Sequence, residues 1–370
     1  MESPCTYFAA LPDPRVNRRQ LHDFQDVIML VLCGVIAGCD EWTQIEQYCK
    51  TKIDFFKTFL KLPNGIPSHD TFGDIFAKLD PLAFEECFLK WMLGVCQLSQ
   101  GEIVSIDGKK LRGSYDTHDK KAAIHMVSAW ANQSRMVLGQ VKVDDKSNEI
   151  TAIPLLIKAL VLKGCIVTID AMGCQTAIAK LIVEAQADYV LALKGNQTTI
   201  HQQVKDSFER EIPEQTYTEL TNDHGRVETR RYAVMTDLKW LETAPAWTGL
   251  RTIVKVESEV YRKVSQKTTS ETRYYLSSLA IKEAQTDIIR VANAVRGHWG
   301  IEASLHWSLD VSFREDQCRV RKGYADQNLS AIRKIGLNLL RADEGSKVGI
   351  KTRRMKAGWD NEYLKRILNI

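Results

Sequence analysis

The chain has 370 residues, of which 44% are apolar and 26% charged, and its formal net charge is +4. This length accommodates one large domain with a smaller module, and this composition excludes a disordered or collagen-like protein. The small total charge also gives no sign of a chain that binds polyanions over its whole surface.

The nine cysteines are scattered, with no C-x-x-C pair or other metal-ligand spacing. Most lie in apolar surroundings, which is typical of buried thiols in a reducing compartment such as the cytoplasm. The apolar run 27–39 is too short to span a bilayer and is flanked by aspartates. We therefore expect no membrane association, and a buried core helix at this run.

Residues 1–98 are predicted to form an N-terminal helical domain. Helical periodicity is interrupted only at turn-forming residues, around Gly38–Asp40, at Pro63-Asn64-Gly65 and at Asp80-Pro81. Ser68 or Asp70 is the expected cap of the helix that follows. This domain contains no clear helix-turn-helix motif.

The character of the sequence changes at Glu102. Short β-branched runs at 103–107 and 165–170 alternate with helical stretches, and two strands around 124–143 flank a turn at 132–134. Strands that alternate with helices after an initial meander predict a mixed sheet with helices on its faces. The second domain, residues 99–370, is therefore expected to be α/β.

A β-rich segment at about 210–285 breaks this alternation and reads as an insertion within the α/β domain. Helical character returns from Thr286. The C-terminal segment 317–370 contains 13 Lys or Arg against 5 Asp or Glu, a balance of 13 − 5 = +8. Such a basic helical segment suits a phosphate backbone, or it is the solvated face of surface helices.

Asp107 and Asp170 each end a short apolar strand. Side chains at strand ends of an α/β sheet project into the crevice where ligands bind. Two carboxylates from neighbouring strands make an oxygen-rich site for a hard cation, Mg²⁺ or Mn²⁺. The alternative is that each Asp merely caps the turn that follows it.

A third acidic ligand is expected from segment 296–310. If this segment is helical, His298, Glu302 and His306 form one polar stripe at i, i+4 and i+8. An ionised Glu among Trp, Ile and Leu is costly to bury unless it is paired or bound to metal. Glu302 is therefore the first candidate, with Asp310 in reserve. The competing acids are Glu149, Glu315 and Asp316. The stripe could also hold zinc, but it lacks the H-E-x-x-H spacing.

Long stretches of the chain resemble the H-repeat-associated insertion-sequence transposases, DDE enzymes found beside Rhs elements in bacteria. The resemblance covers nearly the whole chain. The stretches that carry it are NGIPSHDTF (64–72), SIDGKKLRGSYD (105–116), DDKSNEITAIPLL (144–156), TIDAMGCQTAIA (168–179), DYVLALKGNQ (188–197), HGRVETR (224–230) and RGHWGIEASLHWSLDVSFRED (296–316).

The resemblance implies an RNase H-like mixed sheet flanked by helices, with the β-rich insertion placed before the last catalytic residue. It implies that Asp107, Asp170 and Glu302 are the catalytic acids and the ligands of two Mg²⁺ (or Mn²⁺) ions. Of the related Y-R-E-K signature only the Glu is retained. Arg296 and His306 are the candidates to replace the two lost positive charges.

The implied activity is DNA transposition, in which metal-bound water cleaves at the ends of an insertion element and the released 3′-OH attacks target DNA. The implied partners are double-stranded DNA, as terminal inverted repeats and target, and a second copy of the chain on paired DNA ends. The N-terminal helical domain 1–98 is the candidate for recognising these DNA ends, because a helix can read the major groove. The residues expected to contact DNA are Lys109, Lys110, Arg112, Lys194, Asn196, Arg296, His298, His306, Arg319, Arg321 and Lys322.

Three other functions remain open at this point. A domesticated transposase would keep the fold and the basic surface and bind DNA without cutting it. An RNase H-like nuclease would use the same acids but would not join strands. A hydrolase of small phosphoesters would fit the two aspartates and leave the basic C-terminal segment unexplained.

Overall fold

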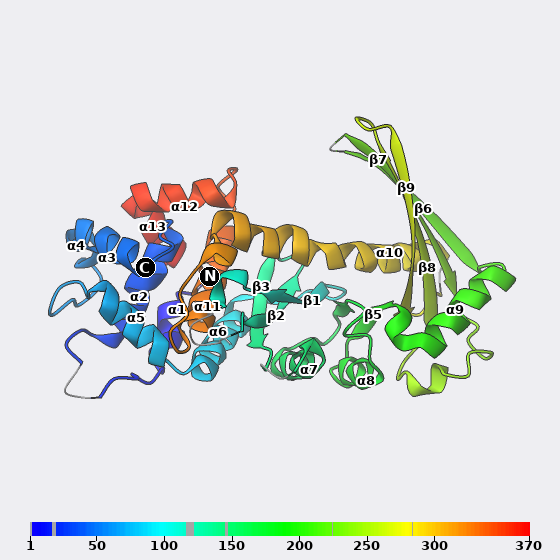
Figure 1. The fold of residues 1–370 in the computed structure, drawn as a ribbon, viewed down its shortest axis with the longest axis horizontal. Helices are drawn as coiled ribbons and strands as arrows, with labels where there is room; N and C mark the ends of the chain where they lie inside the picture. The colour runs from blue at the N-terminus through cyan, green and yellow to red at the C-terminus, as the bar shows by residue number, and fades with distance from the viewer. Residues whose placement is uncertain (1, 17–19, 116–121, 145–146, 224, 283) are drawn as a thin grey trace. The chain divides into compact units, whose positions relative to one another are not determined.

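The computed structural model describes every residue except 1, 17–19, 116–121, 145–146, 224 and 283. Its contacts divide the chain into two compact units, which are drawn in Figure 1. The first unit comprises Met1–Gln97, Gly108–Asn148 and Glu302–Ile370, and the second comprises Leu98–Asp107 and Glu149–Ile301. The N-terminal helices thus share a unit with the C-terminal segment, whereas the sequence suggested a boundary at residue 98 alone.

The first unit is mainly helical. Its α-helices are α1 (Pro4–Phe8), α2 (Phe24–Ile36), α3 (Trp42–Thr51), α4 (Ile53–Phe56), α5 (His69–Lys78), α6 (Pro81–Val95), α11 (Ala325–Ala342), α12 (Ile350–Trp359) and α13 (Asn361–Leu368). It also contains the antiparallel hairpin β2 (His125–Ala131) and β3 (Met136–Lys142). Strand β1 (Ile103–Lys110) begins in the second unit, and its last three residues belong to the first. The short turns of the first unit are η2 (Arg112–Ser114) and η7 (Glu315–Gln317), and η6 (Ser308–Ser312) is a short π-helical stretch.

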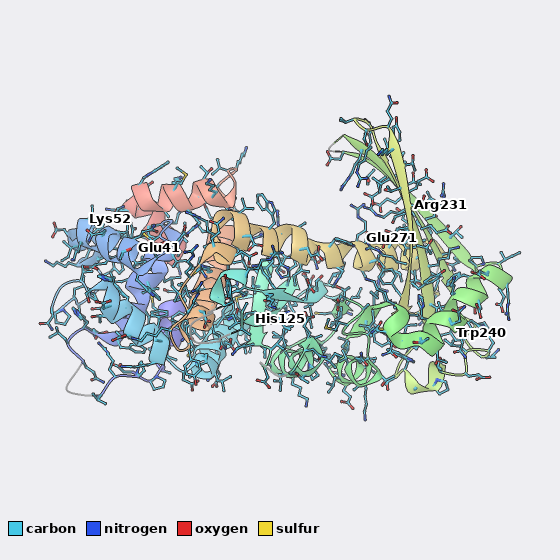
Figure 2. The ribbon with its side chains drawn as sticks, in the orientation of Figure 1. Glu41, Lys52, His125, Arg231, Trp240 and Glu271 are labelled. Carbon is cyan, nitrogen blue, oxygen red and sulfur yellow. The ribbon has the colours of Figure 1, made fainter. Side chains whose placement is uncertain are left out.

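Local sequence explains where several of these helices begin. Ser68 caps α5, as expected, by accepting from the amide of Thr71, and Asp80 caps α6 by accepting from the amide of Leu82. Helix α3 starts after Glu41 and ends before Lys52, the two residues labelled on it in Figure 2. An acid before the first turn and a base after the last both suit the helix dipole.

The expected core helix at the apolar run is α2, in which every residue but Gln25 is buried. It packs against α11, which is buried along almost its whole length. Arg333 and Lys334 of α11 are each only 2% exposed. This part of the basic C-terminal segment is therefore neither a solvated face nor a phosphate contact, and the sequence interpretation was wrong for these two residues.

The second unit is a mixed sheet with helices on its faces, as predicted. Its strands, in the order β1-β4-β5-β9-β8-β7-β6, include β4 (Ile166–Ile169), β5 (Asp188–Leu193), β6 (Gln215–Asp223), β7 (Arg226–Met235), β8 (Thr252–Arg262) and β9 (Lys267–Ser277). Strands β1, β4 and β5 are parallel, and the other pairs are antiparallel. The β-rich insertion is therefore not separate from the sheet, since β9 pairs directly with β5.

Four α-helices cover this sheet: α7 (Glu149–Ala159), α8 (Thr176–Glu184), α9 (Thr198–Arg210) and α10 (Ala284–Gly300). Helix α10 lies on one face, where Ile288, Val291 and Val295 join a buried core with alternate residues of the strands. Helices α7 and α8 pack side by side on the opposite face in Figure 1. Two short turns, η3 (Gly195–Gln197) and η4 (Ala244–Ala246), complete the unit.

None of the helices in the described ranges is both long enough and apolar enough to cross a membrane. Helix α2, built on the apolar run, has 13 residues.

Candidate metal centre

Two predicted acids meet where β1 and β4 separate. The register of these parallel strands ends with the pair Ile106 and Ile169, so Asp107 and Asp170 are the residues that directly follow this pair. Asp107 is not the last residue of its strand, as the sequence suggested, because β1 continues to Lys110. It is the first residue beyond the pairing with β4, which places its carboxylate at the same sheet edge.

Asp170 is held by the turn that follows it. Its Oδ1 accepts hydrogen bonds from the amides of Met172 (3.0 Å) and Gly173 (3.3 Å). Asp170 therefore does cap the turn that follows it, as the alternative interpretation of the sequence expected. This capping does not compete with metal binding, since both amides meet the same carboxylate oxygen.

Glu149 completes an acidic cluster with these two aspartates. One carboxylate oxygen from each of Asp107, Glu149 and Asp170 lies within 4.8 Å of the other two. Glu149 opens helix α7 and is only 6% exposed, whereas both aspartates are half-buried. The sequence analysis included Glu149 among the competing acids. The feature that could have favoured it is its position at the start of a helix that connects two strands.

The electrostatics of the cluster fit a divalent cation. Burial, together with the negative charge of Glu149, raises the pKa of Asp170, against the hydrogen bonds to its carboxylate and the positive charge of Lys194. Three carboxylates this close repel one another unless a cation or a proton lies among them. Oxygen donors alone, with no sulfur or imidazole, suit Mg²⁺ or Mn²⁺ rather than zinc.

A chain of hydrogen bonds joins α10 to both acid-bearing strands. Thr168 donates to Ser105 (3.0 Å), and Ser105 donates to the carbonyl of Gly297 (3.1 Å). Since the hydroxyl proton of Thr168 is already used, Nδ1 of His298 donates to its oxygen at 3.2 Å. Burial lowers the pKa of His298 to about 4. His298 is therefore neutral at pH 7 and packed against Thr168, and its contact with DNA stays a prediction.

Glu302 lies just beyond the end of α10. The backbone widens there into two π-helical stretches, η5 (Ile301–His306) and η6, so the α-helical stripe expected for His298, Glu302 and His306 is not formed. Glu302 is also exposed, and the argument from the cost of burying it was wrong. Glu302 belongs to the first unit and the acidic cluster to the second, so its catalytic role stays a prediction.

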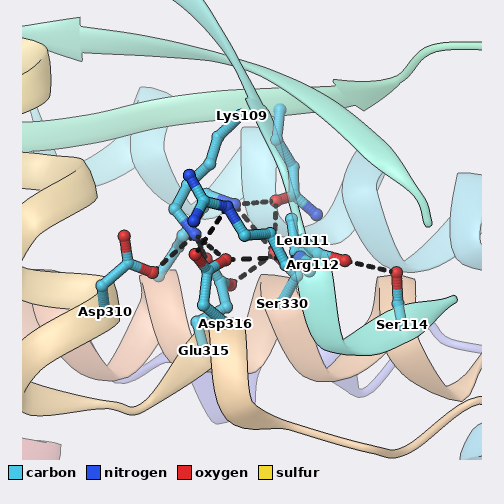
Figure 3. Close-up of polar contacts among 10 residues, drawn as sticks. Lys109, Leu111, Arg112, Ser114, Asp310, Glu315, Asp316 and Ser330 are labelled. Atoms are coloured by element: carbon cyan, nitrogen blue, oxygen red, sulfur yellow. Dashed lines mark hydrogen bonds and ion pairs between the residues drawn. The ribbon is translucent and has the colours of Figure 1, made fainter.

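Lys109 has a different environment from the one expected. Figure 3 shows its ammonium group among three carboxylates, Asp310 (2.7 Å), Asp316 (3.0 Å) and Glu315 (3.3 Å). Its side chain is 10% exposed. Lys109 therefore forms an internal ion cluster rather than a solvated turn, and the three carboxylates occupy its donors.

Several other predicted DNA contacts also have partners within their own unit. Arg296 pairs with Glu219 at 2.5 Å, and Asn196 donates to the carbonyl of Ala171 at 2.7 Å. The remaining paired residues and their partners are Arg112 with Asp316, Arg321 with the carbonyl of Gly113, and Lys322 with Asp74. His306 is half-buried.

Lys110, Lys194 and Arg319 are exposed, and their side chains form no ion pair or hydrogen bond within the described part of the chain. Lys194 follows β5, and its charge acts on Asp170. It is the predicted contact whose environment best suits a phosphate close to the acids.

The fold and the acidic cluster define an α/β protein with a candidate divalent-metal centre at its sheet edge. Residues 98–339 match the family described as "Transposase DDE domain", and residues 5–92 match "DDE_Tnp_1-associated". The chain therefore belongs to the DDE transposase family. The resemblance to H-repeat-associated transposases is confirmed by the relatives.

Two relatives from Escherichia coli match over almost the full length of both chains. "Putative transposase YncI" of strain O157:H7 is 40% identical over 100% of this chain and 95% of its own. "H repeat-associated putative transposase YhhI" of strain K12 is 37% identical over 98% and 96%. Among solved structures, a piggyBac transposase synaptic complex with hairpin DNA aligns with a TM-score of 0.45 and 13% identity, over 99% of this chain and 76% of that one.

Proposed function

We propose that this protein is a metal-dependent transposase that cleaves DNA at the ends of an insertion element and joins the released 3′ ends to target DNA. The observation that carries the proposal is the meeting of Asp107 and Asp170 with a third carboxylate at one sheet edge, in a chain of the DDE transposase family. Its substrates would be the terminal inverted repeats and the target DNA, inside the bacterial cytoplasm.

Asp107 and Asp170 would hold two Mg²⁺ or Mn²⁺ ions. Bound there, the ions would activate the attacking oxygen and stabilise the leaving oxygen of the phosphodiester. The protein's own contribution is to fix the carboxylates: β1 and β4 set their separation, and the turn at Gly173 orients Asp170. Lys194 would neutralise charge on the approaching phosphate.

Two glutamates compete for the place of the third ligand. Glu302 is supported by the resemblance of the segment 296–316 to the family. Glu149 is supported by geometry, since its carboxylate already lies with the two aspartates. We propose Glu302 as the catalytic glutamate and Glu149 as an additional carboxylate that strengthens the metal site.

The test is a cleavage assay on duplex DNA that carries the inverted repeats flanking the gene. The wild-type protein should cut it only with Mg²⁺ or Mn²⁺. Asp107→Asn, Asp170→Asn and Glu302→Gln should each abolish cutting and leave DNA binding intact. Glu149→Gln should raise the metal concentration needed for half-maximal cutting, since loss of a group that supports the metal ligands typically lowers metal affinity by about 10–100-fold. Glu184→Gln, an exposed acid of α8, is the matched control.

The outcomes separate the alternatives. Full activity of Glu302→Gln with loss of activity in Glu149→Gln would exchange the two roles. Cleavage without joined products in a strand-transfer assay would identify a nuclease. Specific binding without cutting at any metal concentration would identify a DNA-binding protein derived from a transposase. Joining two DNA ends requires two active sites, so we also expect a homodimer on DNA, which light scattering of the complex would detect.

A further inference from the structure

The strands β6 to β9 end in two hairpins, and the last register position crosses all four strands. Asp223 pairs with Arg226, Arg226 pairs with Arg262, and Arg262 pairs with Lys267. We call these four residues the end row. Residues directly opposite on neighbouring strands project from the same face, with Cβ atoms about 4.5–5.5 Å apart. Three cationic side chains are therefore neighbours on one face of the sheet.

Elsewhere on this face each basic side chain has an acidic partner. Arg230 pairs with Glu228 at 2.5 Å, and Arg273 makes two hydrogen bonds to Glu271, at 2.7 and 2.8 Å. Arg296 of α10 reaches down to Glu219. These pairs neutralise the surface between the buried core and the end row.

In the end row three cations face a single carboxylate, Asp223, which lies opposite Arg226. The side chains of Arg226, Arg262 and Lys267 form no ion pair or hydrogen bond with any residue that the structure describes. Like charges directly opposite each other destabilise an antiparallel sheet. A negatively charged partner bound at this exposed end would reduce the repulsion between the three cations.

The position of the end row leaves it accessible. It lies on the same face as Tyr232 and Val256, which α10 buries, but further along the strands, and the hairpin ends extend past α10 in Figure 1. All residues from 261 to 270 are exposed, Val264 by 96%. The amide of Lys263 donates to the carbonyl of Gly225 at 2.9 Å, which holds the two hairpins together and adds a fourth cation.

We infer that the end row, with Lys263, is a contact surface for the phosphate backbone of duplex DNA. The cations of the end row lie on an exposed sheet end, whereas small ligands usually bind in concave sites. Arg matches backbone phosphates well, and such contacts fix position without reading sequence. The inference rests on the proposed function for its choice of DNA as the polyanion. It assigns the insertion a role in holding DNA, separate from the metal centre.

The test uses the full-length protein in EDTA, so that binding is measured without cleavage. Dissociation constants are determined against salt for a duplex carrying the flanking repeat and for a scrambled duplex. The triple variant R226A/R262A/K267A should lower the slope of log K against log salt by about 2.7, since each phosphate contact contributes about 0.9. The loss of affinity should be equal on the two duplexes, because backbone contacts carry no sequence information.

A matched control removes the same charge from the opposite face. R231A/K205A/R210A changes one residue of β7 and two of α9, all exposed, and should keep the wild-type slope. Arg231 and Glu271 appear on opposite sides of the strands in Figure 2. The charge-retaining variant R226K/R262K should also keep the slope, which separates charge from packing.

A wild-type slope in the end-row triple variant, or an equal loss in the control, would overturn the inference. The triple variant should not melt at a lower temperature than the wild-type protein, because its substitutions remove repulsion between the three cations. The proposed function fails in a different assay: a wild-type protein that never cleaves the repeat with Mg²⁺ contradicts the transposase activity, and the salt slopes still decide the binding surface.

Discussion

Nζ of Lys109 lies 2.7 Å from Oδ1 of Asp310, inside a cluster that also contains Asp316 and Glu315 (Figure 3). Lys109 follows Asp107 by two residues on β1. The three acids follow Glu302 in the sequence, Asp310 in η6 and the other two in η7. The cluster therefore attaches residues 310–316 to the last residues of β1, which belong to the same compact unit. Although burial opposes it, the positive charges of Lys334, Lys109 and Arg333 hold the pKa of Glu315 at about 2.

Replacing Lys109 should test how much this cluster stabilises the fold. Lys109→Met leaves partly buried carboxylates without their shared cation, and removal of one partner of a buried pair typically costs about 3–5 kcal/mol. We expect a loss of about 3 kcal/mol in the free energy of unfolding, measured by urea denaturation. Lys110→Met, at the adjacent exposed position, should change it by less than about 0.5 kcal/mol. Equal stability of the two variants would show that the ion cluster contributes nothing.

Divalent metal should stabilise the wild-type protein against heat. A cation that binds the folded acidic cluster and not the unfolded chain contributes about 2.7 kcal/mol at a hundred times its dissociation constant. The melting temperature should rise with Mg²⁺ or Mn²⁺ and return on addition of EDTA. Asp107→Asn and Asp170→Asn should lose the response, while Glu184→Gln keeps it. The prediction fails if Mg²⁺ gives the same shift as KCl of equal ionic strength.

Glu85 should make stability fall as the pH rises towards neutrality. Burial raises its pKa to about 7, against hydrogen bonds donated by Gln327 (2.9 Å) and Gln140 (3.3 Å). Because the folded pKa lies above the unfolded value, the native state binds more protons between about pH 4.5 and 7, and stability from this group is lost across that interval.

The measurement is the difference in unfolding free energy between wild type and Glu85→Gln at several pH values. Gln keeps an acceptor oxygen but does not titrate. The difference should change by about 2–3 kcal/mol from pH 4.5 to 7, at about 1.4 kcal/mol per pKa unit. Glu86→Gln is the control, because Glu86 is 64% exposed and pairs with Lys90. A flat difference for Glu85→Gln would show that this carboxyl titrates normally.

The meeting of Asp107 and Asp170 at one sheet edge was predictable because the signal for each aspartate is local. A β-branched run followed by an acid occurs twice, and two such strands placed side by side bring the acids together. Glu149 could be named but not ranked, because its burial depends on how α7 packs over the sheet. The π-helical turns at Glu302 were not predictable either, since they change the helical period without changing the residue pattern.

The basic residues were the hardest to place. Lys109 and Lys334 are buried against counter-ions and hydrogen-bond partners such as Glu315 and Gln140. These partners lie far away in the sequence, so the burial of the two lysines could not be predicted. Composition counts charges and cannot show which ones the fold neutralises internally. Conversely, the end row depends on strand register, which the hairpin turns set and the residue pattern alone does not show.

Gly173 should be required for the geometry of Asp170. Its amide donates to the Asp170 carboxylate, and a Cβ at this position would lie 2.2 Å from Ile169 and 2.9 Å from Ile153. Gly173→Ala must therefore displace the turn away from β4 and α7, at a cost of about 1–3 kcal/mol for an overpacked core. Since β4 leads to Asp170 and α7 begins with Glu149, the metal response and DNA cleavage should fall together. Gly195→Ala, where a Cβ meets nothing within 4 Å, should leave both unchanged. Normal cleavage by Gly173→Ala would mean that the turn can move without moving its acid.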